Sequence, residues 1–151
     1  MATPSSILDA NGTWKGRSQL HLSWLEPHLR EIESDSTLHV EATEAYATIG
    51  YTWAYQGEPQ TGAMHIAKAS DVNHVEIGWV DSWHQSGGVL HLIGAEEGNG
   101  IKAGGTYTAG DETWGWTIAL DVTGDELTIT MENVEPSGNA EWAVRGVYGR
   151  A

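Results

Sequence analysis

The pattern with the clearest chemical content is a carboxylate between two indoles on one strand. From position 74 to 85, the apolar side of a period-two pattern consists of Val75, Ile77, Trp79, Asp81 and Trp83. Side chains two positions apart on a strand share a face, so Asp81 is predicted to be buried beside the indoles. A buried carboxylate needs hydrogen-bond partners or a raised pKa. Asp81 could therefore hold the polar end of a ligand, act as an acid or base, accept hydrogen bonds from Trp and Tyr, or turn outward at a bulge.

Two further polar side chains could join Asp81. Glu44 and Tyr46 would lie on the same face if a single strand over residues 37–55 keeps its inward parity as far as position 46. Gly50 is predicted to bend this strand and to reverse its parity. The residues that face inward after the bend would be Tyr51 and Trp53.

The seven histidines do not follow a metal-binding pattern. None forms His-x-His, no two lie one helical turn apart, and cysteine is absent. A two-residue turn at Gly87-Gly88 would place His84 opposite His91 on the outer face, where the pair could titrate together or bind a metal adventitiously. A three-residue loop would instead bring His91 inward, opposite Trp83. The sequence predicts no resident metal and no cofactor.

Composition excludes several classes of protein. The chain has 151 residues, which is enough for one domain, and seven Lys and Arg against 21 Asp and Glu give a net charge of −14. That charge disfavours nucleic acid and anionic membranes as partners. The N-terminal residues lack the pattern of a secretory signal, and no apolar run reaches the length of a membrane span. A cytoplasmic domain is expected, with its oligomeric state open.

The aromatic residues are unusual because there are eight Trp and five Tyr but no Phe. Trp and Tyr combine a large apolar ring with a polar tip, so this usage suits a partly wet cavity, although drift in aromatic usage explains it equally well. The aromatic residues predicted to face inward are Tyr51, Trp53, Trp79, Trp83, Tyr107, Trp114, Trp116, Trp142 and Tyr148.

Period-two alternation dominates the chain and predicts an all-β domain over residues 1–151, with a lead-in at 1–10. Strands are expected near 12–22, 37–55, 62–69, 74–85, 89–96, 101–109, 113–123, 126–134 and 140–149, and at most one short helical turn lies near 23–33. Almost no helix is available to cover the apolar face of this meander. Closure into an antiparallel up-and-down barrel of about 8–10 strands is therefore predicted.

Hairpin turns fix which residues face each other. Turns or loops at 70–73, 110–111, 124–125 and 136–139 bring the apolar side of each strand onto that of the next. The predicted pairs are Ile66–Ile77, Met64–Trp79, Tyr107–Trp114, Gly105–Trp116, Val122–Leu127, Leu120–Ile129, Ile118–Met131, Asn133–Trp142 and Met131–Val144.

Both ends of the chain resemble the calycin superfamily of lipocalins and fatty-acid-binding proteins. Gly12-Thr13-Trp14 is similar to the Gly-x-Trp motif that opens the first strand of those proteins, and residues 142–148 resemble their Arg-containing last strand. The resemblance implies that an Arg near the C-terminus, Arg145 or otherwise Arg150, stacks on Trp14. The start of the chain, residues 78–82 and the strand order also look similar to an uncharacterised bacterial lipocalin-like family of unknown function. The haem-binding nitrobindins of this superfamily use a histidine near the C-terminus, and this chain has none after His91.

The sequence is compatible with three functions. The first is binding of a small apolar or aromatic ligand inside the barrel, through Trp53, Trp79, Asp81, Trp83, Tyr107, Trp114, Trp116, Trp142 and Tyr148. The second is an isomerase, cyclase or lyase that uses the same cavity with Asp81 as acid or base, by analogy with the fold alone. The third is a structural or interaction protein, because thirteen large rings could fill the barrel and leave no cavity.

Overall fold

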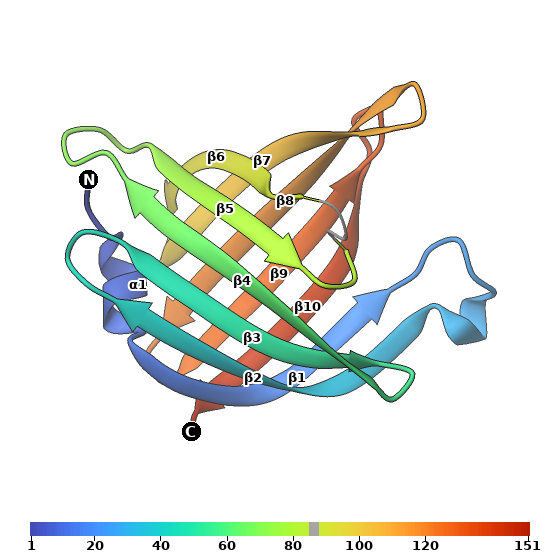
Figure 1. The fold of residues 1–151 in the computed structure, drawn as a ribbon, viewed down its shortest axis with the longest axis horizontal. Coiled ribbons are helices and arrows are strands. Elements are labelled where there is room, and N and C mark those ends of the chain that lie inside the picture. The colour runs from blue at the N-terminus through green and yellow to red at the C-terminus, as the bar shows by residue number, and fades with distance from the viewer. Residues whose placement is uncertain (85–87) are drawn as a thin grey trace.

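The computed structural model describes residues 1–84 and 88–151, and over these residues ten antiparallel strands form one closed barrel (Figure 1). The chain winds up and down around the barrel, and β1 closes it by pairing with both β2 and β10. The strands are β1 (Gly12–His21), β2 (Glu31–Ala42), β3 (Ala47–Tyr55), β4 (Glu58–Lys68), β5 (Val75–Asp81), β6 (Leu90–Glu97), β7 (Gly100–Ala109), β8 (Glu112–Thr123), β9 (Glu126–Val134) and β10 (Ala140–Arg150). The predicted all-β, up-and-down barrel is confirmed.

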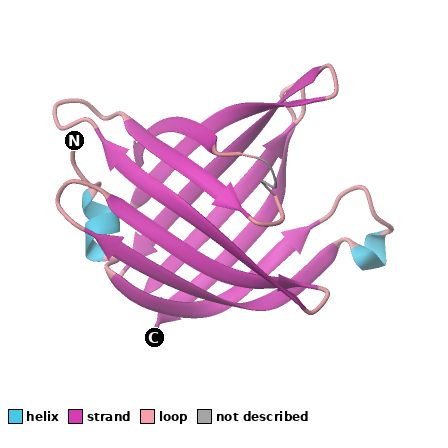
Figure 2. Ribbon diagram, in the orientation of Figure 1, coloured by secondary structure: helices cyan, strands magenta, loops and turns pink. Residues whose placement is uncertain are grey.

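Helix is limited to two short segments in the described residues (Figure 2). The 3-10 helix η1 (Pro27–Leu29) lies where the single helical turn was predicted, between β1 and β2. The helix α1 (Ser5–Asp9) lies in the N-terminal segment, for which no helix was predicted. Neither helix has the length or apolar character needed to cross a bilayer.

The inward positions of successive strands build a continuous core. Alternate residues of each strand point to one face, and this face carries aliphatic side chains that are almost completely removed from solvent. Burying one Leu or Ile side chain stabilises the fold by about 1.5–3 kcal/mol. Fully buried members include Leu38, Ile49, Met64, Ile66, Ile77, Leu92, Ile101 and Ile118.

Cross-strand pairing follows the predicted register in three of the four hairpins, namely β4–β5, β7–β8 and β8–β9. The exception is the β9–β10 hairpin. There Trp142 pairs with Glu132, and not with Asn133 as predicted, whereas Val144 pairs with Met131 as predicted. A register shift between Trp142 and Val144, typical of a β-bulge, explains the difference because the bulge adds an unpaired residue to β10.

The predicted single strand over residues 37–55 is wrong, because β2 and β3 are separate strands. The Thr43 hydroxyl accepts hydrogen bonds from the backbone N–H groups of Ala45 and Tyr46, so residues 43–46 form a tight turn. This turn, and not a bend at Gly50, reverses the parity. Glu44 and Tyr46 are consequently exposed on the turn and do not join Asp81.

One end of the barrel is closed by the N-terminal segment. Ile7 of α1 and Ala10 are completely buried against the core, next to the fully buried indole of Trp14. The Trp14 Nε1–H group donates a 2.8 Å hydrogen bond to the carbonyl of Ala10. The helix therefore covers this end of the barrel and leaves the opposite end as the place where a ligand could enter.

Arg150 is the arginine that stacks on Trp14. Its guanidinium carbon lies 4.4 Å from the centre of the Trp14 ring system, and its nitrogens donate to the carbonyls of Asp9 and Asn11. The first assignment, Arg145, is wrong because residue 145 points outward, where its guanidinium lies 4.2 Å from the Trp142 ring. Arg150 thus fastens the N-terminal segment to the closed end.

Candidate functional site

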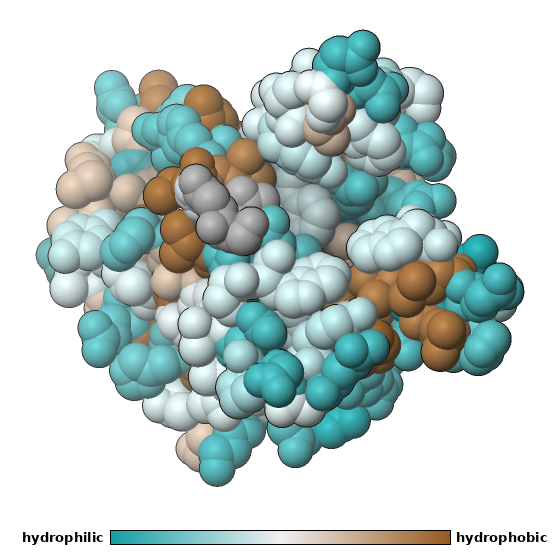
Figure 3. Space-filling model, turned by 45° about the vertical axis from the view of Figure 1, so that its right-hand side comes forward, coloured by the Kyte–Doolittle hydropathy of each residue, from teal (hydrophilic) through white to brown (hydrophobic). Residues whose placement is uncertain are grey.

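The end of the barrel opposite α1 contains an open cavity of about 650 Å³. It lies between the β1–β2 connection, the turn after β5, the start of β6 and the outer ends of β7 to β10. Figure 3 looks toward this side, and the brown residues at its right belong to the β1–β2 connection. Lining residues that bear on function are Leu20, His21, Leu22, Trp24, Trp83, His84, Tyr107, Trp116, Asn133, Glu141 and Trp142.

Aromatic rings from several elements contribute to the cavity wall. Trp83 follows the end of β5 and Trp116 lies on β8, and Trp142 stacks on His21 with a 4.6 Å distance between ring centres. Tyr107 donates a 2.6 Å hydrogen bond to the side-chain oxygen of Asn133, which leaves the amide nitrogen of Asn133 available as a donor. The wall therefore combines aromatic rings with fixed polar groups.

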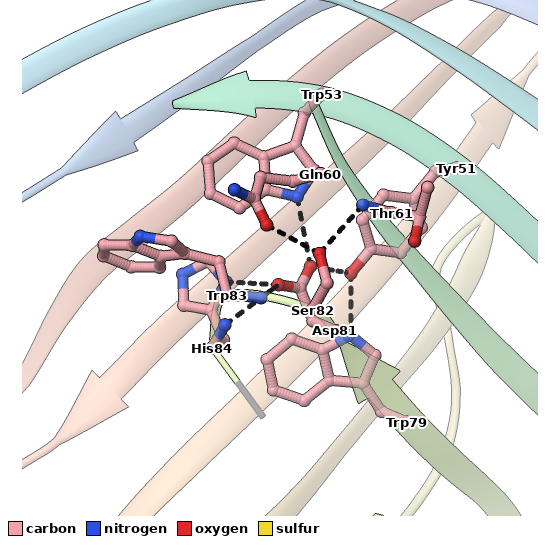
Figure 4. Close-up of polar contacts among 9 residues, drawn as sticks. All are labelled: Tyr51, Trp53, Gln60, Thr61, Trp79, Asp81, Ser82, Trp83 and His84. Carbon is pink, nitrogen blue, oxygen red and sulfur yellow. Dashed lines mark hydrogen bonds and ion pairs between the residues drawn. The ribbon is translucent and has the colours of Figure 1, made fainter. Parts of the chain in front are cut away.

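Asp81 lies below this cavity, at the end of β5, and its carboxylate is almost completely buried. One oxygen, Oδ2, accepts hydrogen bonds from the Tyr51 hydroxyl at 2.7 Å and from Trp53 Nε1 at 3.2 Å. The other, Oδ1, accepts from the backbone N–H groups of Trp83 at 2.8 Å and His84 at 2.9 Å (Figure 4). Asp81 therefore joins two aromatic side chains of β3 to the turn that follows β5.

The imidazole of His84 completes the contacts of Asp81. Its Nδ1 atom lies 3.3 Å from Oδ1 of the carboxylate. Burial alone would raise the pKa of Asp81, but the hydrogen bond and charge of His84, its backbone N–H group and the Tyr51 hydroxyl together lower it to about 2. Burial, and then the negative charge of Asp81, raise the pKa of Tyr51. Asp81 is thus a carboxylate and Tyr51 a neutral donor at neutral pH.

This ionisation predicts a loss of stability in acid. The pKa of Asp81 in the folded protein lies below its ordinary value of 3.8, so its contribution is present above about pH 4 and is lost as the pH falls toward 2. A shift of this size corresponds to about 2 kcal/mol. Urea unfolding at a series of pH values should show a steeper decline for the wild type than for Asp81→Asn. Parallel curves would contradict the prediction.

His84 occupies a position that was not predicted. The strand that was expected to continue to position 85 ends at Asp81. In the pairing of β5 with β6, Gly78 lies opposite His91 and Ile77 lies opposite Leu92. His91 is therefore exposed on the outer face, where it bonds Glu76, and it does not pair with His84, which was one of the two arrangements that the sequence left open. His84 instead lies inside the mouth of the barrel, with only 12% of its side chain exposed. The alternative placing of His91 inward is also wrong, and Gly87 of the predicted turn lies outside the described residues.

Four indoles surround the imidazole of His84. Ring centres of Trp53, Trp79, Trp83 and Trp116 all lie between 4.8 and 5.8 Å from the centre of the His84 ring. Packing on several sides restricts the rotamer of the imidazole. Asp81 and the indoles therefore hold His84 in one orientation.

Gly62 makes room for the hydrogen bond between Tyr51 and Asp81. It is the cross-strand partner of both residues, on β4 between β3 and β5. A Cβ atom at this position would come within 2.1 Å of the Tyr51 ring. The Tyr51 ring thus lies across the glycine, and its hydroxyl also accepts a 2.8 Å hydrogen bond from Trp79 Nε1.

A small internal void continues below His84. Its volume is about 20 Å³, enough for one water molecule, and it is enclosed by both polar and apolar groups. The lining residues are Ser18, Leu20, Tyr51, Trp53, Asp81, His84, Ile129, Met131, Val144 and Tyr148. The core side chains below this void have almost no accessible surface, so the space for a ligand inside the barrel lies at the open end.

The structure gathers most of the predicted site residues around these two spaces. Trp83, Tyr107, Trp116 and Trp142 line the open cavity, and Trp53, Asp81 and Tyr148 line the void. Trp79 lines neither, because it lies behind Trp116, on which it stacks. Trp114 also lines neither space, although it pairs with Tyr107.

Sequence reasoning missed His84, His21, Trp24 and Asn133. A signal for His84 exists, since an Asp whose side chain accepts from the N–H groups two and three residues later ends a strand in a turn. Ser82 supports this turn from the outside by bonding Gln60 and Thr61 (Figure 4). Across residues 1–84 and 88–151, no group of three His, Asp or Glu side chains is placed to hold a metal ion.

Comparison with known proteins gives the fold. No family model and no curated protein matches the sequence. The chain is similar in structure to Rv2717c from M. tuberculosis, with a TM-score of 0.65, 14% sequence identity and coverage of 99% of both chains. At this identity the likeness is one of fold alone. Together with the closed ten-strand barrel, it fits a calycin-like barrel fold.

Proposed function

We propose that this protein binds a small aromatic or apolar molecule in the open cavity at the mouth of its barrel, in the manner of a lipocalin-like carrier. The observation that carries the proposal is an open space of about 650 Å³ whose walls include indole, phenol and imidazole rings beside aliphatic and polar side chains. Small-molecule sites are clefts of roughly 300–1,000 Å³ with mostly apolar walls and a few fixed polar groups.

The remaining features agree with a small-molecule ligand. A net charge of −14 disfavours nucleic acid and anionic lipid surfaces as partners. The filled barrel below His84 leaves the ligand only the outer part of the interior. We therefore propose a compact ligand of one or two fused rings. We also propose that it is bound without a cofactor and that the protein acts in the cytoplasm.

Trp83→Ala is the variant that tests binding. Trp83 lines the cavity and packs edge-on against Trp53, so its removal should weaken binding of 2-naphthol and 2-methoxynaphthalene by about tenfold each, or 1.4 kcal/mol. Affinities would be measured by titration calorimetry, with protein injected into dilute ligand. Trp114→Phe is the matched control, because Trp114 does not line the cavity. Absence of saturable binding to the wild type would contradict the proposed function.

A second function, proton transfer to or from a bound substrate, is favoured by the contact between Asp81 and His84. The lowered pKa of Asp81 makes it a poor base, so His84 would move the proton and Asp81 would orient it. His84→Phe should then reduce turnover by roughly 10²–10⁴-fold, because it removes the group that moves the proton. Product analysis of the wild-type protein with its bound ligand distinguishes the two functions, since a carrier returns the ligand unchanged.

A further inference from the structure

His84 is the polar group best placed to meet a ligand at the floor of the cavity. Its side chain lines both the open cavity and the void below it. The ring is inward, nearly buried, and packed among four indoles. A molecule that enters the cavity and reaches its floor therefore contacts the imidazole.

The contact with Asp81 determines which ring nitrogen is available. A carboxylate can only accept hydrogen bonds, so the Nδ1 atom that lies 3.3 Å from Oδ1 carries the hydrogen of this bond. In a neutral imidazole the other nitrogen, Nε2, is then an acceptor. Because the two nitrogen directions of the ring diverge, Nε2 points away from Asp81. No described residue donates a hydrogen bond to it.

The surrounding charges decide what kind of ligand group fits Nε2. Asp81 lies directly beneath the imidazole, and Glu141 is the carboxylate among the residues that line the cavity. His21 is the other titratable imidazole on the wall, and no Lys or Arg is among the lining residues that the structure describes. A ligand carboxylate would therefore face two negative charges, while the guanidinium of Arg145, which stacks on Trp142, is not among the lining residues. A neutral group with an O–H or N–H donor avoids this repulsion.

Ring shape adds the second requirement. Trp83 and Trp116 flank His84, and Trp142 with His21 forms a stacked wall at the rim of the cavity. Stacked and edge-to-face contacts with aromatic side chains stabilise an aromatic ligand beyond the area that it buries. The space beside the imidazole is thus suited to a planar ring whose polar edge points toward Nε2.

We infer that the ligand is a neutral, planar aromatic compound with one O–H or N–H group, and that His84 Nε2 accepts the hydrogen bond from this group. The inference rests on the proposed function and names the ligand class. Asp81 acts here as a positioning residue, because it fixes the hydrogen on Nδ1 and so keeps Nε2 free to accept.

The experiment compares three ligands that share one ring system. The ligand 2-naphthol offers the donor, 2-methoxynaphthalene lacks it, and 2-naphthoate replaces it with a negative charge. Wild-type protein should bind 2-naphthol about tenfold more tightly than the methyl ether, the equivalent of one hydrogen bond of 1.4 kcal/mol. It should bind 2-naphthoate more weakly than 2-naphthol.

Two substitutions assign the preference to His84. His84→Phe keeps an aromatic ring and removes both nitrogens, so the affinity for 2-naphthol should fall to that for the ether, which should change by less than about twofold. His84→Leu serves if the Phe variant does not fold, and it too should remove the preference because it has no acceptor. Trp142→Ala is the matched control, because Trp142 lines the cavity and stacks on His21 rather than on His84, so it should weaken both neutral ligands and leave their ratio unchanged.

The outcomes separate this inference from the proposed function. Equal wild-type affinities for 2-naphthol and its ether, a preference that survives both His84 substitutions, or tighter binding of 2-naphthoate would overturn the inference while binding itself stands. Failure of the neutral ligands to bind the wild type would overturn the proposed function as well.

Discussion

Replacement of Asp81 by alanine is expected to lower the free energy of unfolding by about 3–5 kcal/mol. The substitution removes the acceptor of hydrogen bonds from Tyr51, Trp53 and the backbone N–H groups of residues 83 and 84. A buried donor left without a partner costs about 1–3 kcal/mol, and loss of one member of a buried charged network costs about 3–5 kcal/mol. Urea unfolding followed by Trp fluorescence measures this loss.

Two other substitutions calibrate the effect. Asp81→Asn keeps the shape and one acceptor oxygen, so its loss should be smaller than that of the alanine variant. Asp121, exposed on β8, provides the control for removing a carboxylate, and Asp121→Ala should change stability by no more than about 0.5 kcal/mol. If the Asp81→Ala and Asp121→Ala variants were equally stable, the hydrogen bonds that Asp81 accepts would not stabilise the fold.

Replacement of Gly62 by alanine is the second large effect, with an expected loss of about 2–4 kcal/mol. The added methyl group would overlap the Tyr51 ring, so the ring must move away from its position across the glycine. That movement breaks the hydrogen bonds of the Tyr51 hydroxyl with Asp81 and with Trp79 Nε1. Two buried polar groups would then lack a partner, which accounts for the expected size.

Gly78→Ala is the matched control for Gly62→Ala. Gly78 lies on the neighbouring strand β5, and its nearest neighbour to an added methyl group is a Val89 carbon at an ordinary 3.8 Å. Its substitution should therefore be close to neutral. Tyrosine exposure measured by ultraviolet difference spectroscopy gives a second readout, since Tyr51 should become more exposed only in the Gly62 variant. Equal stability of the two variants would show that the ring does not depend on the glycine.

The barrel could be predicted because its signals are local. Alternation of apolar and polar residues sets the face of each strand, and turns at Gly110 and Gly124 set the register. Both glycines adopt positive φ, of 65° and 59°, which suits a tight hairpin turn. The β2–β3 turn was missed because its hydrogen bonds come from Thr43, and no glycine or proline marks it.

The site was only partly predictable for a related reason. The inward position of Asp81 follows from alternation, but the end of β5 at the same residue depends on side-chain hydrogen bonds to the backbone. A strand that continues past Asp81 would place His84 on the outer face, and the sequence therefore did not identify its imidazole as part of the site. The bulge in β10 was also not predictable, because the added residue leaves the alternation of apolar and polar residues intact on either side of it.

The most direct test of ligand binding at the open end uses fluorine NMR on protein in which all eight tryptophans are 5-fluorotryptophan. Single Trp→Phe variants assign the resonances, and 2-naphthol is then titrated into the labelled protein. The signals of Trp83, Trp116 and Trp142 should shift saturably, because these indoles line the cavity, while the signal of Trp14, buried at the closed end, stays in place. Saturable shifts confined to Trp14, or no shift at the three cavity indoles, would contradict the account.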